Sequence, residues 1–232
     1  MPPNRDRARS LAASPPFAML TLGLDTSGDV CAVALLDGDA ALFRAEIAVA
    51  RAHGRRLAPL IGQAFEHAGR DLSGLGLVAV ANGPGSFTGL RIGMSTAKGL
   101  ALATGAAFVG VPTLAALAST ASASGTVVAV LPSRRGEVYA GAYREGREVL
   151  PPAALAVDEV GGWLPRPCVV GGPGADRLGP ALPRVALEAS GVAVARLGLA
   201  RFRATGAEDP AAAEPAYLKP VATSQPRAIF GP

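Results

Sequence analysis

The sequence predicts an α/β protein made of two similar lobes with a cleft between them. Two observations support this prediction. A β-hairpin, followed later by a short apolar strand that runs into a Gly-Pro-Gly loop, occurs twice in the same order along the chain. The two hairpins start 106 residues apart, at Leu20 and Thr126. A period that long indicates duplicated lobes and not a solenoid of short repeats.

The first lobe is expected to open with a three-stranded meander and to continue with alternating helices and short strands. Turn residues at 25–29 and 37–39 separate the strands of the meander. Period and turn signals predict strands over 20–24, 30–36, 40–47, 78–81 and 107–111, and helices over 55–68, 87–104 and 113–119.

The second lobe is expected to repeat this order, with strands over 126–131 and 137–143 and an apolar segment at 167–170 before the loop at 171–174. We therefore expect an N-terminal lobe over 19–121 and a C-terminal lobe over 122–232. Residues 1–18 are rich in proline and arginine and lack the apolar stretch of a signal peptide, so we expect a disordered tail, with Met19 as an alternative start.

The composition argues against direct nucleic-acid binding and against a membrane span. The net charge is +4, but no basic run exceeds two residues and aromatic residues make up only 5%. The uncharged stretch over 99–133 is interrupted by glycine, proline and a Ser/Thr cluster. Cys31 and Cys168 lie in apolar segments, which favours buried, reduced thiols and a cytoplasmic location.

Asp25 and Thr26 follow the first apolar strand and open a Thr-Ser-Gly turn. A carboxylate there, beside free backbone N–H groups, could hold a metal-bound phosphate. The alternative is that the two side chains only cap a tight turn. The spacing alone favours this structural interpretation.

The loop around Gly83, Gly85 and Ser86 precedes the predicted helix over 87–104. Glycine lets a backbone approach a ligand closely, and a helix N-terminus favours an anion. The loop is neither a Walker A motif nor a dinucleotide fingerprint. Phosphate contact and a purely structural strand-to-helix turn both remain open.

Metal-dependent and hydrolytic chemistry have little support in the sequence. His53 and His67 are the only histidines, and about 21 Å would separate them on a continuous helix. No Cys or His cluster has metal-ligand spacing, so we expect no metal site. There is no nucleophile elbow around Ser86, and no catalytic residue can be assigned.

Four sequence blocks together resemble the TsaB (YeaZ) family, within the glycoprotease-like superfamily. The blocks are LGLDTS at 22–27, NGPGSFTGLRIG at 82–93, GEVY at 136–139 and EPAYLK at 214–219. The resemblance runs from about residue 19 to 220, and the second block is highly specific. It implies an actin/hexokinase/Hsp70-like (ribonuclease H-like) fold.

The resemblance also implies a function in forming N6-threonylcarbamoyladenosine at position 37 of tRNAs that read ANN codons. In that family the protein is a non-catalytic scaffold that pairs with the metal-containing TsaD-type paralogue, which transfers the threonylcarbamoyl group. A TsaE-type ATPase joins the complex, and family members form homodimers when alone. The resemblance thus implies no cofactor for the chain itself, ATP with Mg²⁺ at an interface of the complex, and only indirect contact with tRNA.

One position departs from the family pattern and bears on the alternative function, an actin-fold ATPase or kinase that uses Asp25. Relatives often carry Asp just after the first strand of the second hairpin, where this chain has Pro132. A metal–phosphate site commonly needs carboxylates or comparable ligands to hold the ion, so the loss of this carboxylate argues against independent phosphoryl transfer.

A row of small residues, Gly89, Gly93 and Ala97, recurs every fourth position on the predicted helix over 87–104. Two interpretations are open: close packing on the chain's own sheet, or close approach of a partner helix. Since TsaB proteins pair through first-lobe helices, we expect a partner interface here. Its expected residues are Gly89, Arg91, Gly93, Ala97 and Lys98, together with Leu60 and Phe65 of the neighbouring helix.

Overall fold

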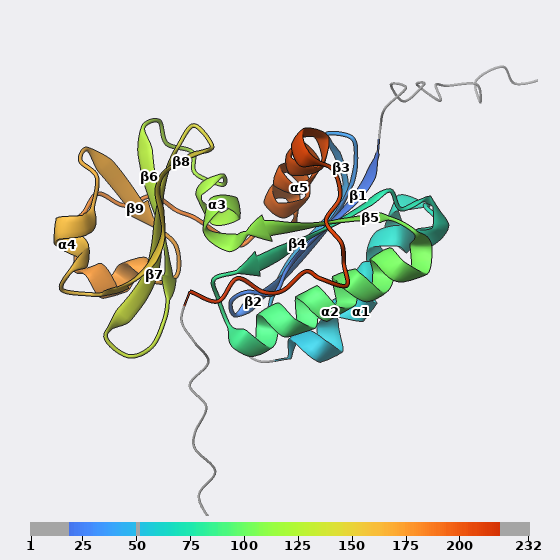
Figure 1. Ribbon diagram of the computed structural model, residues 1–232, viewed down its shortest axis with the longest axis horizontal. Helices are drawn as coiled ribbons and strands as arrows, with labels where there is room; N and C mark the ends of the chain where they lie inside the picture. Colours follow the sequence, from blue (N-terminus) through green and yellow to red (C-terminus); the bar gives the residue numbers. More distant parts are fainter. Residues whose placement is uncertain (1–18, 50–51, 219–232) are drawn as a thin grey trace, which may run out of the picture.

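The computed structural model describes residues 19–49 and 52–218. The expected tail over 1–18 lies outside these residues, as does Lys219 of the fourth sequence block. Two sheets stand side by side, each with helices packed against it (Figure 1). No helix in the described part of the chain is long and apolar enough to cross a membrane.

The first sheet has the strand order β3-β2-β1-β4-β5. β1, β2 and β3 form the predicted antiparallel meander, whereas β4 and β5 run parallel to β1. The strands are β1 (Leu20–Asp25), β2 (Val30–Asp37), β3 (Ala40–Ala48), β4 (Leu77–Gly83) and β5 (Ala107–Pro112). The parallel pairing brings the carboxyl ends of β1 and β4 together, so the turns that follow them share one edge of the sheet.

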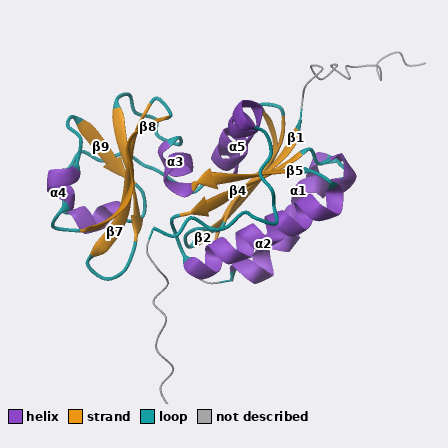
Figure 2. Cartoon of the chain, viewed as in Figure 1, coloured by secondary structure: helices purple, strands orange, loops and turns teal. Residues whose placement is uncertain are grey.

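Helices cover both faces of this sheet (Figure 2). α1 (His53–Ala68) and α2 (Phe87–Thr104) lie on one face, and α5 (Gly191–Thr205) lies on the other. β4 is buried on both sides, because Val78 and Val80 join one core and Leu77 and Ala79 join the other. This two-sided burial is why the strand is a continuous apolar run without alternation.

The packing of α5 differs from the expected division of the chain into 19–121 and 122–232. Glycines let this helix approach the first sheet closely: a Cβ on Gly198 would collide with Ala79, and one on Gly191 would lie 2.6 Å from the backbone N of Ala34. The segment after residue 190 therefore returns to the first lobe, so the C-terminal lobe does not include all of 122–232.

The second sheet repeats the first with one strand fewer, in the order β8-β7-β6-β9. Its strands are β6 (Thr126–Pro132), β7 (Glu137–Arg144), β8 (Arg147–Ala156) and β9 (Cys168–Gly171). β6 pairs antiparallel with β7 and parallel with β9, as β1 does with β2 and β4. The short helical elements are η1 (Leu72–Gly74), α3 (Thr113–Ala118), α4 (Val160–Trp163) and η2 (Ala175–Leu178). This duplication confirms the predicted actin/hexokinase-like fold class.

Candidate functional site

The turn after β1 is held by a buried carboxylate. The Asp25 side chain is 3% exposed, and its Oδ1 accepts a hydrogen bond from the backbone N–H of Ser27 at 2.8 Å. Burial raises the pKa of the Asp25 carboxyl above its ordinary value of 3.8, whereas hydrogen bonds from Ser27 and the charge of His53 lower it less. The carboxylate thus points into the fold and stabilises the turn, as the structural interpretation predicted.

His53 holds the same turn from another side. The buried His53 donates from Nε2 to the carbonyl oxygen of Gly28 at 2.8 Å, and its Nδ1 is buried without a hydrogen-bond partner in the described chain. Burial and the charge of Asp25 raise the pKa of the Cys31 thiol to about 11. Cys31 is thus a buried thiol, and Cys168 is a half-buried one.

Thr26 connects this turn to α2. Its buried hydroxyl donates to the carbonyl oxygen of Gly89 at 2.7 Å. A Cβ on Gly89 would collide with the Thr26 carbonyl, and one on Gly93 would collide with the Thr26 hydroxyl. Thr26 therefore fills the space that the two glycines leave on α2.

The Gly-Pro-Gly loop after β4 is packed against the chain's own backbone. A Cβ on Gly85 would lie 2.5 Å from the carbonyl oxygen of Ser27, and one on Gly83 would lie 2.5 Å from that of Ala216. Gly83 has φ +124°, and its N–H donates to the hydroxyl of Thr113. These glycines make room for neighbouring peptide groups, so this arrangement favours the structural turn over a phosphate cradle.

Ser86 is the residue of this loop that reaches solvent. Its backbone N–H donates to the carbonyl oxygen of Ser27 at 2.7 Å, and its Oγ accepts from the backbone N–H of Gly89 at 3.3 Å. Ser86 thus caps α2 as predicted, and it lines the cleft described next.

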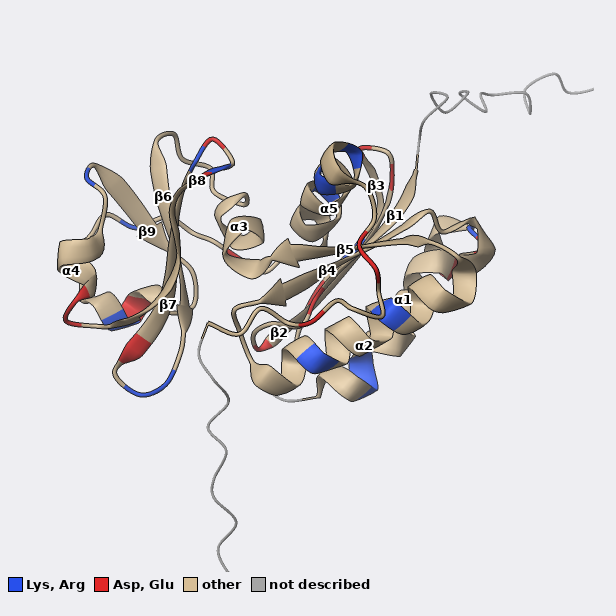
Figure 3. Ribbon diagram, in the orientation of Figure 1, with Lys and Arg blue, Asp and Glu red and all other residues tan. Residues whose placement is uncertain are grey.

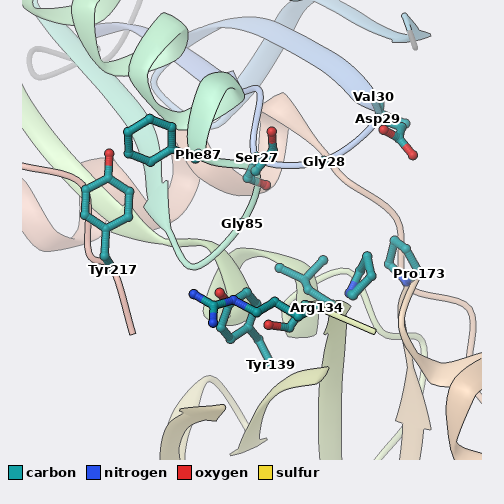
Figure 4. Close-up of a pocket in the computed structure, with 14 residues that line it drawn as sticks. Ser27, Gly28, Asp29, Val30, Gly85, Phe87, Arg134, Tyr139, Pro173 and Tyr217 are labelled. Carbon is teal, nitrogen blue, oxygen red and sulfur yellow. The ribbon is translucent and has the colours of Figure 1, made fainter. Parts of the chain in front are cut away.

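A cleft of about 600 Å³ lies between the two lobes (Figure 4). The β1–β2 turn, the β4–α2 loop, the β6–β7 hairpin and the loop after β9 contribute its walls. Asp29 is the carboxylate among the lining residues, whereas Asp25 is not among them. Pro132 occupies the opposite wall.

Aromatic rings and one arginine complete the cleft. Figure 4 shows Phe87 and Tyr217 beside each other on one wall, and Arg134 with Tyr139 on another. The rings of Phe87 and Tyr217 lie 5.4 Å apart, centroid to centroid. The Arg177 guanidinium holds the opposite hairpin, donating to the carbonyl oxygens of three of its residues: Ser133, Arg134 and Glu137.

Sequence reasoning missed these lining residues. Phe87 and Tyr217 belong to quoted sequence blocks, but 130 residues separate them, and only the folded C-terminal segment joins them. The backbone N–H of Ala216 donates to the carbonyl oxygen of Asn82 at 2.7 Å, which fixes this segment beside β4. Within the described residues, no group of three Cys, His, Asp or Glu side chains could hold a metal ion.

The expected partner interface needs correction at most of its positions. Gly89, Gly93 and Ala97 are buried against the chain's own β1–β2 turn and β4. Leu60 and Phe65 belong to the core beneath α1. The row of small residues therefore serves the packing of α2 on its own sheet. The two charged members differ: Arg91 is exposed and Lys98 is half-buried.

The duplicated sheets and the cleft between their hairpin turns define an actin/hexokinase-like protein. The family model described as "TsaD: tRNA N6-adenosine threonylcarbamoyltransferase" matches residues 46–223. Two solved structures, "YeaZ from Pseudomonas aeruginosa" and a Pseudomonas aeruginosa protein "with similarity to peptidase YEAZ", align with TM-scores of 0.74 and 0.75 at 29% and 28% identity. They cover 86% and 87% of this chain, and all of each structure is covered.

Curated relatives point the same way. The "tRNA threonylcarbamoyladenosine biosynthesis protein TsaB" of Escherichia coli K12 is 35% identical over 129 residues, 54% of this chain and 55% of that protein. The protein of the same description from Haemophilus influenzae is 36% identical over 121 residues, 51% of each. The chain thus spans about half the length of the curated relatives it matches. With the structural matches, these findings show that the chain belongs to the TsaB (YeaZ) family.

Proposed function

We propose that this chain is a non-catalytic subunit in the formation of N6-threonylcarbamoyladenosine at position 37 of tRNAs that read ANN codons. It pairs with a TsaD-type transferase, and a TsaE-type ATPase joins the complex in the cytoplasm. Nucleotide with Mg²⁺ binds at an interface of the complex, and the chain meets tRNA only through its partners. Alone, the chain forms homodimers.

The position of Asp25 is the observation that carries the proposal of a non-catalytic role. A phosphoryl-transfer site needs a carboxylate that reaches metal or nucleophile. The Asp25 side chain is buried and accepts from Ser27 inside the turn. The facing hairpin has Pro132 at the family's usual Asp position, so the described residues that line the cleft include no pair of facing carboxylates there.

The experiment is reconstitution of tRNA modification from purified components. TsaD-type and TsaE-type proteins from the same organism are incubated with threonylcarbamoyl adenylate and unmodified tRNA, with and without this chain. We expect modification only when the chain is present, and a stable complex of chain and TsaD-type protein on size-exclusion chromatography. Equal modification without the chain would remove the proposed function.

The alternative function, an actin-fold ATPase or kinase that uses Asp25, is tested with the purified chain alone. The isolated chain is incubated with ATP and Mg²⁺, and both binding heat and phosphate release are measured. We expect no turnover. Stoichiometric binding with hydrolysis that Asp25→Asn abolishes would favour an actin-fold ATPase or kinase instead.

A further inference from the structure

A second cavity, of about 260 Å³, shares no lining residue with the cleft. We call it the α3 pocket, because α3, the segment after this helix, the β7–β8 turn and Leu197 of α5 form its walls. Figure 3 shows this turn, with a red segment between blue ones, beside α3. Small residues leave the space open, namely Ala115, Ala118, Ala121, Ala123, Gly125 and Gly146.

One wall of the α3 pocket carries a buried hydroxyl. Tyr143 on β7 lines the pocket and is 4% exposed, and its Oη has no hydrogen-bond partner in the described part of the chain. The ring lies over Gly141, where a Cβ would come within 3.0 Å of the hydroxyl oxygen. A glycine inside a strand weakens the strand and often marks a close approach of another group. The strand therefore lacks a side chain where this phenol needs the room.

Packing alone does not explain the Tyr143 hydroxyl. Phenylalanine would fill the same space in the core, and a buried hydroxyl that makes no hydrogen bond costs free energy. Burial, and to a lesser extent the charge of Glu148, raises the pKa of the Tyr143 hydroxyl above its ordinary value of 10.0. The hydroxyl therefore keeps its proton and is a hydrogen-bond donor that lacks an acceptor.

Glu145 is the charged residue among those that line the α3 pocket. It is exposed in the β7–β8 turn with φ +51°, a conformation in which glycine or asparagine is usual. Within the described residues its carboxylate has no ion pair, and the guanidinium of the neighbouring Arg144 donates to the Thr126 hydroxyl instead. The Ser119 hydroxyl already donates to a backbone carbonyl of α3. The pocket thus offers a buried donor and a carboxylate acceptor at its rim.

We propose that the α3 pocket binds a small neutral molecule with an apolar body and a primary carboxamide group. The carboxamide oxygen accepts from the Tyr143 hydroxyl, its N–H groups donate to the Glu145 carboxylate, and the apolar body packs on the alanines and Leu197. A cavity of about 150 Å³ holds benzene, so this larger pocket has room for a ring and an amide group. A carboxylic acid would be repelled by the Glu145 charge, and a hydrocarbon would leave the Tyr143 hydroxyl unpaired.

The test uses the full chain with benzamide as the probe, in an NMR titration that gives the affinity and the residues affected. We expect changes centred on residues 115–127 and 143–146, and benzamide to bind at least tenfold more tightly than benzoate. Tyr143→Phe should weaken benzamide about fivefold or more, as the loss of one hydrogen bond does. Glu145→Gly, at a backbone conformation that suits glycine, should remove the preference over benzoate.

The matched control is Tyr139→Phe, the same change on the same strand, because Tyr139 lines the cleft and not the α3 pocket. Benzamide affinity should be unchanged in this variant. An affinity that Tyr139→Phe lowers and Tyr143→Phe does not would overturn the proposal, because benzamide would then occupy the cleft. The absence of any benzamide binding up to its solubility limit would overturn it as well.

Thermal unfolding of the same variants separates ligand binding from a structural role of the hydroxyl. Without benzamide, Tyr143→Phe should unfold at the same temperature as the unaltered chain or a higher one, because an unpaired buried hydroxyl is removed. A clear loss of thermal stability would show that the hydroxyl is bonded within the fold and would overturn the proposal. So would a crystal structure with benzamide in which an ordered water stays on the Tyr143 hydroxyl, since water would then be its partner.

Discussion

Asp25 occupies the position of a nucleotide-site carboxylate, but its contacts are those of a turn residue. We expect Asp25→Asn to keep the hydrogen bond from Ser27, because the amide Oδ1 also accepts. The modification rate of the reconstituted complex should therefore change by less than about tenfold, whereas removal of a general acid or base typically costs about 100-fold or more. A loss of several orders of magnitude with unchanged assembly would contradict the non-catalytic role.

The same substitution tests the electrostatics of the turn. Because burial raises the pKa of Asp25, the folded chain holds this proton at pH values where the unfolded chain has lost it. The group's contribution to stability is therefore complete below pH 3.8 and is lost as the pH rises from there through the raised pKa. We expect Asp25→Asn to gain stability relative to the unaltered chain across this interval, measured by urea unfolding at several pH values. A pH-independent difference would show that Asp25 does not titrate differently on folding.

From sequence alone, Gly93 was expected to contact a partner helix, whereas in the structure it packs against Thr26 of its own chain. A Cβ on Gly93 would collide with the Thr26 hydroxyl, so Gly93→Leu should destabilise the monomer itself, by about 3 kcal/mol or more. Gly99→Ala is the matched control, because that site is open and alanine should stabilise the helix by about 1 kcal/mol. Thermal unfolding followed by circular dichroism measures both. A folded Gly93→Leu monomer of normal stability that cannot pair would restore the partner-surface interpretation.

Among the elements, those with local signals could be predicted. The helix over 87–104 was predicted with the bounds it has, since Ser86 caps it and Gly105 ends it in the left-handed conformation. The antiparallel hairpins were also found, since turn residues mark them. α5 was not predicted, and neither was its return to the first sheet. Its position depends on close contacts of Gly191 with Ala34 and of Gly198 with Ala79. These residues are far apart in the sequence, so no local pattern predicts the contacts.

The contribution of α5 can be measured with a pair of leucines. Leu199 is 4% exposed and packs into the core between α5 and the first sheet, whereas Leu102 on α2 is mostly exposed. Leu199→Ala should lower the free energy of unfolding by about 2–5 kcal/mol, and Leu102→Ala by less than about 0.5 kcal/mol. Urea denaturation gives both values. Equal effects would mean that α5 is not part of the cooperative fold.

At the scale of the whole molecule, the duplication predicted where the cleft lies but not which residues line it. Two repeated hairpins predict two facing turns, and the β1–β2 and β6–β7 turns do meet across the cleft. The aromatic wall was not predicted, because Tyr217 reaches it through a segment without regular secondary structure. The closed packing of Gly83 and Gly85 was also hidden, since glycine is compatible with both a ligand and a neighbouring peptide group.

α3 contacts both lobes, and its contacts indicate that the two lobes unfold together. Leu114 and Leu117 on this helix pack into the core of the second sheet, while Thr113 at its start accepts from the N–H of Gly83 in the first lobe. α5 also contacts α3. Unfolding of either lobe would therefore remove contacts that stabilise the other, and we expect a single cooperative unfolding transition.

Two probes that report different lobes can test this expectation. Trp163 is the sole tryptophan of the chain and packs against the core of the second sheet. Far-UV circular dichroism is dominated by α1, α2 and α5, which all lie on the first sheet. The fluorescence and dichroism transitions in urea should coincide, and Leu114→Ala should shift both to lower urea by the same amount, since Leu114 is fully buried and its truncation costs about 2–5 kcal/mol. Separate midpoints would show that the lobes unfold independently, and a shift of the fluorescence transition alone would confine α3 to the second lobe.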